Sequence, residues 1–429
     1  MLVHNAGTAQ TGKRPMLPAD LYKMPAVSDP QVSPDGQWVS YTLSIVDSIK
    51  DSRSTDIWMV SWDGRTNIQL THSPESETAP RWSPDGKYLS FLSSRQEGKG
   101  NQLWLLDRRG GEAKRITTYK SGISAYAWAP DGNKVLLTIT DPEPEDTGKL
   151  KTAKPMVMDR YKIKQDGEGY RYKKLYSHLY LFDIEKKKTD TLTKGAYNHS
   201  AAVWSPDGKQ IAFVSNRTED PDKNQNNDIF VMDAKPGAVA KKMTTWTGND
   251  NNPQWSPDGR WIAYTRSTSP DNYAMYDQPV LAVIPASGGD PKLLSLDLDR
   301  GVSNPRWMAG GTSVVALVTD DRQQYPASFD VQTGQMTRLL DGLDVLQATH
   351  EAAGKWAVLS SNSTTPTEVF AFENNALRRL TTHSDSVMAG KTLASVKGIT
   401  ASAKDGNVVN GILFTPADAS PDKPLPLLL

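Results

Sequence analysis

Short runs of alternating apolar and polar residues, separated by polar turns, fill most of this chain. The stretch from Trp82 to Thr117 shows the pattern in full. Trp82 precedes a Ser-Pro-Asp-Gly turn, the strand-like runs Tyr88–Leu92 and Leu103–Asp107 follow, and Ile116-Thr117 closes the unit after a glycine pair. Short runs with a period of two, bounded by Gly, Pro and Asp, are typical of β-strands joined by tight turns.

The turn recurs along the chain. Ser-Pro-Asp-Gly occupies residues 33–36, 83–86, 205–208 and 256–259, and Ala-Pro-Asp-Gly occupies 129–132. Successive copies begin 50, 46, 76 and 51 residues apart, which matches one four-stranded propeller blade per copy if the longest interval contains an insertion of roughly half a blade. Two weaker copies, Trp307–Gly311 and Glu351–Gly354, bring the number to seven. The sequence therefore predicts an all-β fold, a seven-bladed β-propeller.

The chemistry of the turn favours a structural role for its residues. Proline presets φ at the first central position, aspartate bonds its own backbone, and glycine adopts the positive φ that a tight hairpin requires. We therefore interpret the repeated aspartates as turn residues and not as catalytic groups; they are Asp35, Asp85, Asp131, Asp207 and Asp258.

The repeats divide the chain into three parts. Residues 1–27 precede them, residues 28–395 form the propeller with an insertion at about 141–177, and residues 396–429 follow. In the last part, the sequence pattern predicts a two-stranded hairpin, Val396–Ser402 and Val408–Thr415, around an Asp-Gly type I′ turn. Its final leucines, after a proline-rich linker, are typical of the first residues of a buried parallel strand whose partners are missing.

Composition narrows the function classes. Lys plus Arg and Asp plus Glu number 49 each, so no net charge draws the protein toward nucleic acid or anionic lipid. The mean hydropathy is −0.54 and no apolar run approaches the length of a membrane helix. The absence of cysteine excludes disulfides, thiolate metal sites and cysteine nucleophiles. The first 30 residues contain no signal peptide, and they fit either a trimmed mature start or a flexible terminus.

Several motifs together resemble one family. They are the Trp-Ser-Pro-Asp-Gly turns, the closing Leu-Thr pairs, the element Gln165–Tyr170 followed by Ser177–Leu181, and the tail Lys404–Leu413. This combination is similar to the propeller part of the prolyl-oligopeptidase (S9) superfamily of serine peptidases, in the acylaminoacyl-peptidase and dipeptidyl-peptidase-5-like branch. The resemblance spans nearly the whole chain, although propellers of the TolB type share the turn motifs.

The resemblance implies a propeller that caps an α/β-hydrolase domain, with residues 1–27 and 396–429 on the hydrolase side. The catalytic Ser, Asp and His are then expected outside this chain, and the chain alone is expected to be inactive. No Gly-x-Ser-x-Gly motif is present, and we interpret the near miss at Ser303 as a loop residue. The six histidines lack metal-ligand spacing, so we expect neither a metal nor another cofactor.

The insertion contains the candidate substrate-binding residues. A carboxylate can pair with a peptide's α-ammonium group, an arginine can bind a carboxylate or carbonyl, and tyrosines provide flat walls. A solvated charged loop is the alternative interpretation. The candidates are Arg160, Tyr161, Asp166, Glu168, Tyr170 and Arg171.

The resemblance and the candidate residues lead to an expected function. The chain is predicted to gate access to a serine exopeptidase or oligopeptidase and to recognise the end of a short peptide. The alternative is a non-enzymatic TolB-like propeller that binds a protein or peptide, and a third, weaker hypothesis is a metal-dependent sugar or lactone enzyme. The expected partners are peptide substrates and the missing hydrolase domain, with a homo-oligomer allowed and neither nucleic acid nor membrane. The expected location is periplasmic or secreted, with the cytoplasm as the alternative.

Overall fold

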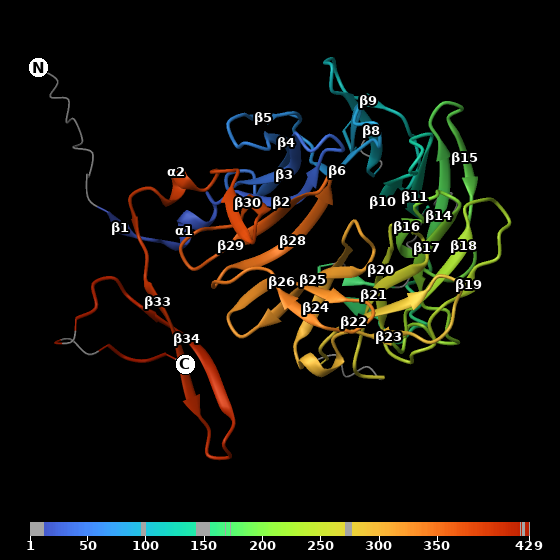
Figure 1. Ribbon diagram of the computed structural model, residues 1–429. Helices are drawn as coiled ribbons and strands as arrows, with labels where there is room; N and C mark the ends of the chain where they lie inside the picture. The colour runs from blue at the N-terminus through green and yellow to red at the C-terminus, as the bar shows by residue number, and fades with distance from the viewer. Residues whose placement is uncertain are drawn as a thin grey trace, which may run out of the picture.

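The computed structural model describes residues 13–95, 100–142, 155–167, 169–171, 173–270, 277–420, 422 and 425–428. Among them, strands dominate and form a ring of antiparallel sheets (Figure 1). Five of these sheets have four strands, and an eight-stranded sheet consists of two further four-stranded units joined by a single parallel pairing between Gln324 and Val345. The prediction of an all-β propeller is confirmed.

Each four-stranded unit is one continuous segment of the chain. The strands of the first four units are β2 (Ala26–Val32), β3 (Trp38–Asp47), β4 (Ser52–Ser61) and β5 (Asn67–Gln69); β6 (Glu77–Trp82), β7 (Tyr88–Ser93), β8 (Gln102–Asp107) and β9 (Lys114–Arg115); β10 (Ile123–Trp128), β11 (Lys134–Thr140), β14 (Ser177–Asp183) and β15 (Lys188–Thr191); and β16 (Ser200–Trp204), β17 (Gln210–Ser215), β18 (Asp228–Asp233) and β19 (Lys241–Lys242). Those of the remaining units are β20 (Asp250–Trp255), β21 (Trp261–Arg266), β22 (Val280–Pro285) and β23 (Lys292–Leu293); β24 (Gly301–Trp307), β25 (Ser313–Asp320), β26 (Gln323–Asp330) and β27 (Met336–Arg338); and β28 (Val345–Ala352), β29 (Lys355–Ser361), β30 (Glu368–Glu373) and β31 (Ala376–Arg379). A 3-10 turn, η2 (Leu296–Leu298), links the fifth and sixth units.

The first strand of each unit lies innermost, because these first strands contact one another around the ring. Each inner strand is interrupted by a β-bulge, and in four of them a residue with positive φ precedes a proline there. Proline lacks an N–H donor, so it is tolerated at a bulge on a strand that has a free inner edge. The four pairs are Asp29-Pro30, Ala79-Pro80, Asn252-Pro253 and Asn304-Pro305.

The repeated turn has the expected structural chemistry. In the second unit the Ser83 hydroxyl donates to the Asp85 carboxylate over 2.6 Å, and the backbone N–H of Lys87 donates to the same carboxylate over 3.0 Å. These two hydrogen bonds lower the pKa of Asp85. Gly86 closes the turn at φ 67°, a conformation that favours glycine. The aspartate is therefore occupied in holding the hairpin.

Tryptophans that precede the turns connect several neighbouring units. The indole N–H of Trp82 donates to the carbonyl of Gln31 over 3.0 Å, and that of Trp307 donates to the carbonyl of Gln254 over 2.8 Å, in each case on the preceding inner strand. Trp204 makes the same bond to Ala127 over 3.2 Å. Trp128 instead donates to the Ser90 hydroxyl over 2.8 Å, and the indole nitrogen of Trp255 is buried without a hydrogen-bond partner.

This difference gives a matched pair of variants. Trp307→Phe is expected to lower the free energy of unfolding by about 1 kcal/mol more than Trp255→Phe, because only the first change removes a hydrogen bond. Urea unfolding of both variants measures the difference. Equal destabilisation would contradict a linking role for the indole N–H.

The first and last units close the ring without exchanging a strand. The two units share one core, in which Val39 and Tyr41 pack with Leu359 and Val369. Polar contacts cross the same seam: Trp62 Nε1 donates to Glu373 Oε1 over 2.7 Å, Lys355 Nζ donates to the Gly36 carbonyl over 2.8 Å, and Val32 N donates to His350 Nδ1 over 3.0 Å. Closure therefore depends on side-chain packing and on these contacts.

His350 makes the stability of this seam depend on pH. Burial, and then the positive charges of Arg306 and Arg81, lower the pKa of His350 to about 3. The imidazole therefore stays neutral in the folded protein in mild acid. An unfolded histidine takes up a proton near pH 6.5, so below that pH the unfolded state binds more protons and the stability present at higher pH is lost. Between pH 7 and pH 5 the advantage of the wild type over His350→Gln should shrink by about 2 kcal/mol.

Urea unfolding at pH 7, 6 and 5 measures this change, with the exposed His72→Gln as the control. A difference between wild type and His350→Gln that stays constant over this range would contradict a histidine that stays neutral in the folded protein.

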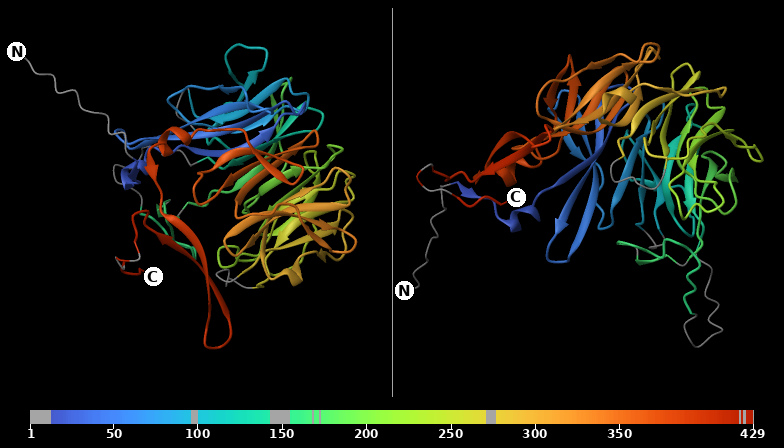
Figure 2. Two further views of the ribbon diagram at one scale, coloured as in Figure 1. Left: turned by 60° about the vertical axis from the view of Figure 1, so that its left-hand side comes forward. Right: turned by 90° about the horizontal axis from the view of Figure 1, so that it is seen from below.

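The two terminal segments lie together beside the ring (Figure 2). β1 (Arg14–Pro15) pairs in parallel with β32 (Lys391–Thr392), next to the short helices α1 (Pro18–Leu21) and α2 (Asp385–Met388). The buried Asp20 accepts two hydrogen bonds from Arg14, each 2.7 Å long, and lies 3.6 Å from Lys391. The Arg14 hydrogen bonds lower the pKa of Asp20.

The predicted terminal hairpin is present as β33 (Ser395–Ser402) and β34 (Val408–Thr415). The predicted type I′ turn is wrong, because that turn needs positive φ at two residues and only Gly406 has it, at 88°. The N–H of Gly406 instead bonds the carbonyl of Ala403 over 3.0 Å, as in a type I turn followed by a glycine bulge. Arg322 of the ring donates to the carbonyl of Gly411 and fills the space that a Cβ on Gly398 would need.

Candidate functional site

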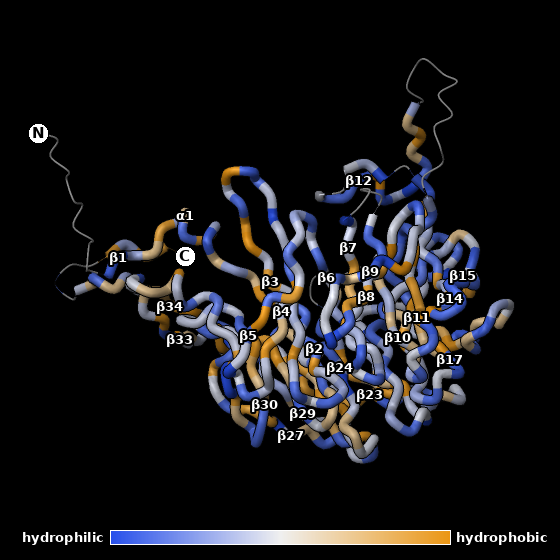
Figure 3. Tube along the Cα trace, turned by 90° about the horizontal axis from the view of Figure 1, so that it is seen from above, coloured by the Kyte–Doolittle hydropathy of each residue, from blue (hydrophilic) through white to orange (hydrophobic). Residues whose placement is uncertain are grey.

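Loops from several units gather on one face of the ring. The Ser-Pro-Asp-Gly turns join first to second strands, so the loops between second and third strands lie at the opposite face. The chain also enters β2 and leaves β31 at that opposite face, which we call the terminal face. Figure 3 shows the β3–β4 loop and β12 extending from it. The segment between β11 and β14, which contains the predicted insertion, is one of these loops.

A pocket of about 1000 Å³ opens on the terminal face between the insertion and the loop that joins β17 to β18. The insertion contributes cationic and aromatic side chains, and the β17–β18 loop contributes carboxylates and amides. We call this cavity the insertion pocket. Its charged and aromatic lining includes Arg160, Tyr161, Arg171, Lys174, Tyr176, Tyr197, Glu219, Asp220 and Asp222.

Hydrogen bonds hold the insertion over the fourth unit. The N–H of Lys162 donates to the Asp222 carboxylate over 2.7 Å, which ties the insertion to the β17–β18 loop. A small antiparallel pair, β12 (Lys164–Gln165) and β13 (Gly169–Tyr170), forms within the insertion. At its end the N–H of Tyr176 donates to the Asp141 carboxylate over 3.1 Å. Loops fixed at both ends in this way can present side chains to a ligand.

The predicted site residues separate into two groups. Arg160, Tyr161 and Arg171 line the insertion pocket. Asp166 and Tyr170 lie on the β12–β13 hairpin, where both are exposed, and they are not part of the lining. Glu168 lies outside the described residues.

The carboxylates that face the insertion come from a loop that the sequence analysis did not select. Glu219, Asp220 and Asp222 stand in an acidic stretch of the sequence, and that charge pattern was the available signal. Asp220 also pairs with Lys223 over 2.8 Å. The insertion wall also includes Asp159, which pairs with Lys174, and the loop wall includes Lys223, so the pocket offers donors and acceptors for both ends of a zwitterion.

A buried histidine supports the floor of the pocket. Asn198 and Ser200 line the pocket, and His199 between them is 1% exposed. Its Nδ1 is 2.9 Å from the carbonyl of Ser177, and the guanidinium of Arg217 donates to its Nε2 over 3.2 Å. Burial lowers the pKa of His199 to about 4, so the ring is neutral at pH 7. His199 therefore acts as a structural group below the pocket.

The interpretation of Ser303 as a loop residue is wrong. Ser303 lies within the inner strand β24, and Asn304 after it has φ 55° at the bulge. The bulge and Pro305 give this strand the local sequence of a loop. Among the described residues, no group of three His, Cys, Asp or Glu side chains is arranged to hold a metal ion.

Fold and site together define a class of protein: a β-propeller with a charged pocket on the face where both terminal segments leave the ring. The chain belongs to the TolB beta propeller domain (PD40) family, whose model matches residues 11–156 and 170–375. In the part of the chain that the structure describes, no helix is long and apolar enough to cross a membrane.

Peptidases are among the similar proteins. Dipeptidyl-peptidase 5 from Porphyromonas gingivalis is 26% identical over 359 residues, which cover 79% of this chain and 51% of that protein. The uncharacterized peptidase YuxL from Bacillus subtilis is 28% identical over 218 residues, which cover 50% and 33%. The structure of acylaminoacyl peptidase from Pyrococcus horikoshii superimposes with a TM-score of 0.72 at 16% identity, over 92% of this chain and 59% of that one.

These comparisons confirm the predicted resemblance to the propeller part of prolyl-oligopeptidase-superfamily peptidases. The chain spans about half the length of dipeptidyl-peptidase 5 and a smaller share of YuxL.

Proposed function

We propose that this chain is the substrate-gating propeller of a serine peptidase that hydrolyses short peptides through an acyl-enzyme. The observation that carries the proposal is the insertion pocket, which combines arginines and carboxylates on the terminal face. In this proposal the catalytic domain packs on that same face. The peptidases among the similar proteins support the substrate class.

The pocket is proposed to bind one end of the peptide. Asp220 and Asp222 offer acceptors for an α-ammonium group, while Arg160 and Arg171 offer donors for a carboxylate or for backbone carbonyls. Tyr161 is 70% exposed and can cover a bound side chain. Asp166 and Tyr170, on the adjoining hairpin, are proposed to contact the peptide farther from its bound end. The same role is proposed for Glu168, which lies outside the described residues.

Binding one end fixes where the chain is cut. A peptide held in the pocket presents a set number of residues to the catalytic domain, and the closed ring keeps folded proteins away. The propeller alone has no nucleophile in this proposal, so the chain by itself is expected to be inactive.

The terminal segments are proposed to belong with the catalytic domain. β1, within residues 1–27, pairs with β32, which shortly precedes residues 396–429. Their exposed apolar side chains include Leu17 at 52%, Leu21 at 63% and Phe414 at 65% exposure. Surfaces of this kind are typical of a contact with another domain. We also propose an exported protein, periplasmic or secreted, with a cytoplasmic location as the alternative.

A non-enzymatic propeller that binds a protein or peptide is the second candidate, because the matching family model is the TolB type. The gene sequence beyond codon 429 separates the two candidates. The peptidase proposal expects a His-Gly-Gly turn followed by Gly-x-Ser-x-Gly within the next domain. A gene that ends there, or continues into a domain without these motifs, would overturn it.

A further inference from the structure

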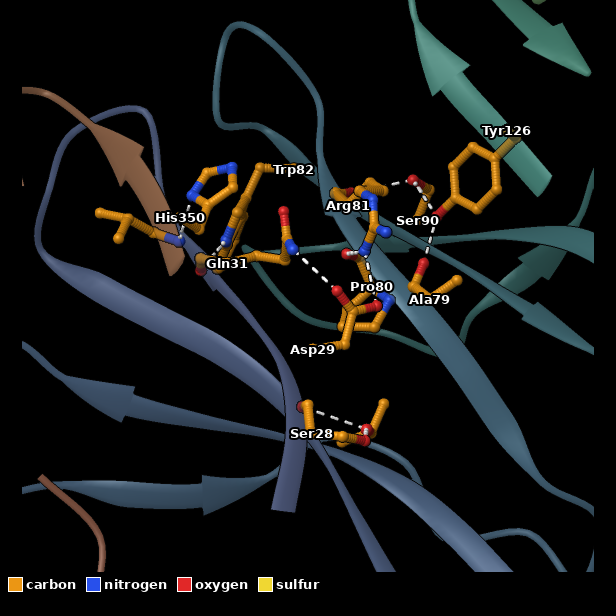
Figure 4. A network of polar contacts seen from close by, with 12 residues as sticks. Ser28, Asp29, Gln31, Ala79, Pro80, Arg81, Trp82, Ser90, Tyr126 and His350 are labelled. Atoms are coloured by element: carbon orange, nitrogen blue, oxygen red, sulfur yellow. Dashed lines mark hydrogen bonds and ion pairs between the residues drawn. The ribbon is translucent and has the colours of Figure 1, made fainter. Parts of the chain in front are cut away.

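The inner strands bring an excess of positive charge into the centre of the ring. Arg81 on β6 and Arg306 on β24 belong to the second and sixth units, and His350 on β28 belongs to the seventh. Figure 4 shows the surrounding network. Asp29 is its carboxylate: Arg81 donates to Asp29 Oδ2 over 2.7 Å, and the Gln31 amide donates to Oδ1 over 2.8 Å. Asp29 therefore pairs with Arg81, while the charge of Arg306 acts on Arg81 and His350.

Arg306 is the cation that this network leaves uncompensated. Its guanidinium donates to the carbonyl of the adjacent Pro305 over 3.0 Å, and among the described residues no carboxylate lies within ion-pair distance of it. Burial, and then the positive charge of Arg81, lower the pKa of Arg306 to about 10. A half-buried guanidinium without an anion destabilises a fold, so its presence here suggests a ligand that supplies the anion.

His350 adds a further donor and no acceptor. Its Nδ1 accepts the N–H of Val32 over 3.0 Å, so the proton of the neutral ring is on Nε2. These three side chains therefore add N–H donors as well as positive charge to this region.

The inner strands of the third to fifth units form a different wall. A cavity of about 160 Å³ lies among β10, β16 and β20. Four alanines line it, together with larger side chains that include Tyr126, Leu136 and Val203; the alanines are Ala125, Ala127, Ala201 and Ala202. Gln254 on β20 borders the same cavity. The inner strands therefore carry cationic side chains on some units and, on other units, a small cavity bordered by these four alanines, which we call the alanine wall.

We propose that the centre of the ring is a second peptide site, which binds the carboxylate of a peptide with small side chains through Arg306 and Arg81. The carboxylate completes the charge balance of the two arginines, and methyl-sized side chains lie against the alanine wall. The site shares no residue with the insertion pocket, so it stands or falls separately from the proposed function.

Calorimetric titration of the 429-residue protein tests the proposal with three probes: acetyl-trialanine with a free carboxylate, its C-terminal amide, and inorganic phosphate. The free acid should bind at least about tenfold more tightly than the amide, because a charge-assisted pair with arginine is lost in the amide. Arg306→Met should weaken binding of the acid by a similar factor. Arg109→Met, which removes an exposed arginine paired with Asp107, is the matched control and should bind normally.

Thermal unfolding separates binding from folding. Arg306→Met should be at least as stable as the wild type, because it removes an unpaired cation, and Arg306→Lys, which keeps the charge but not the fork, should bind with intermediate affinity. The proposal would be overturned if the acid and the amide bound equally well, or if Arg306→Met bound the acid as the wild type does. Binding of inorganic phosphate with no binding of the peptide acid would also overturn it.

Discussion

Replacing Glu368 with alanine is expected to lower the free energy of unfolding by about 3–5 kcal/mol, a large loss for a single exchange. Glu368 begins β30 of the last unit and has no exposed surface. It accepts hydrogen bonds from the Thr381 hydroxyl, from the Ser384 N–H over 2.8 Å and from the Ser384 hydroxyl over 2.7 Å, and it pairs with Arg379 over 3.2 Å. Alanine leaves the Thr381 and Ser384 donors buried without this acceptor, while Arg379 keeps its pairing with Asp385.

The pKa of Glu368 indicates how well it is compensated. Burial alone would raise this pKa, but the hydrogen bonds from Thr381 and Ser384 outweigh burial and lower it. Glu368→Gln keeps the shape and an acceptor oxygen, so it should be destabilised by clearly less than the alanine variant. Urea unfolding at pH 7 compares the three proteins. A loss below about 0.5 kcal/mol for Glu368→Ala would show that this network does not hold the end of the last unit.

The second large effect concerns catalysis by the full-length protein. Changing Arg160 and Arg171 together to methionine is expected to lower kcat/KM for free-ended peptides about 30-fold or more, because each arginine supplies charge-assisted hydrogen bonds to the substrate. Steady-state kinetics with a panel of acyl-, free-amino- and carboxyl-terminal peptides measures the change. The panel also identifies which end the pocket binds.

Two controls keep this result specific. Arg65→Met removes an exposed arginine in a turn on the opposite face and should leave kcat/KM unchanged. Arg109→Met removes another exposed arginine outside the pocket lining and should also leave kcat/KM unchanged. A double arginine variant with wild-type kinetics on every substrate would show that the insertion pocket does not bind the substrate.

Local chemistry made the ring predictable. Ser83, Asp85 and Gly86 determine their turn through contacts within a few residues, so the motif alone located the hairpins. The same locality misled at Ser303, where a bulge in an inner strand has the residues of a loop. It also misled at Gly406, since the Asp-Gly pair suits more than one turn type.

The sites depend on contacts between distant parts of the sequence. The insertion pocket forms because Lys162 bonds Asp222, 60 residues later, and the ring closes where Val32 meets His350, 318 residues later. The periodicity of apolar residues along the sequence contains no information about such distant pairs. The sequence could therefore select Arg160, Tyr161 and Arg171 by residue type, but it could not identify the carboxylates that face them.

Labelling with a fluorophosphonate probe tests the central claim most directly, with the product of the complete gene beside this 429-residue chain. The account predicts that the complete product is labelled and cleaves short peptides, while the chain described here is neither labelled nor active. A complete product that is unlabelled and inactive on every peptide, or a 429-residue chain that cleaves peptides by itself, would contradict it.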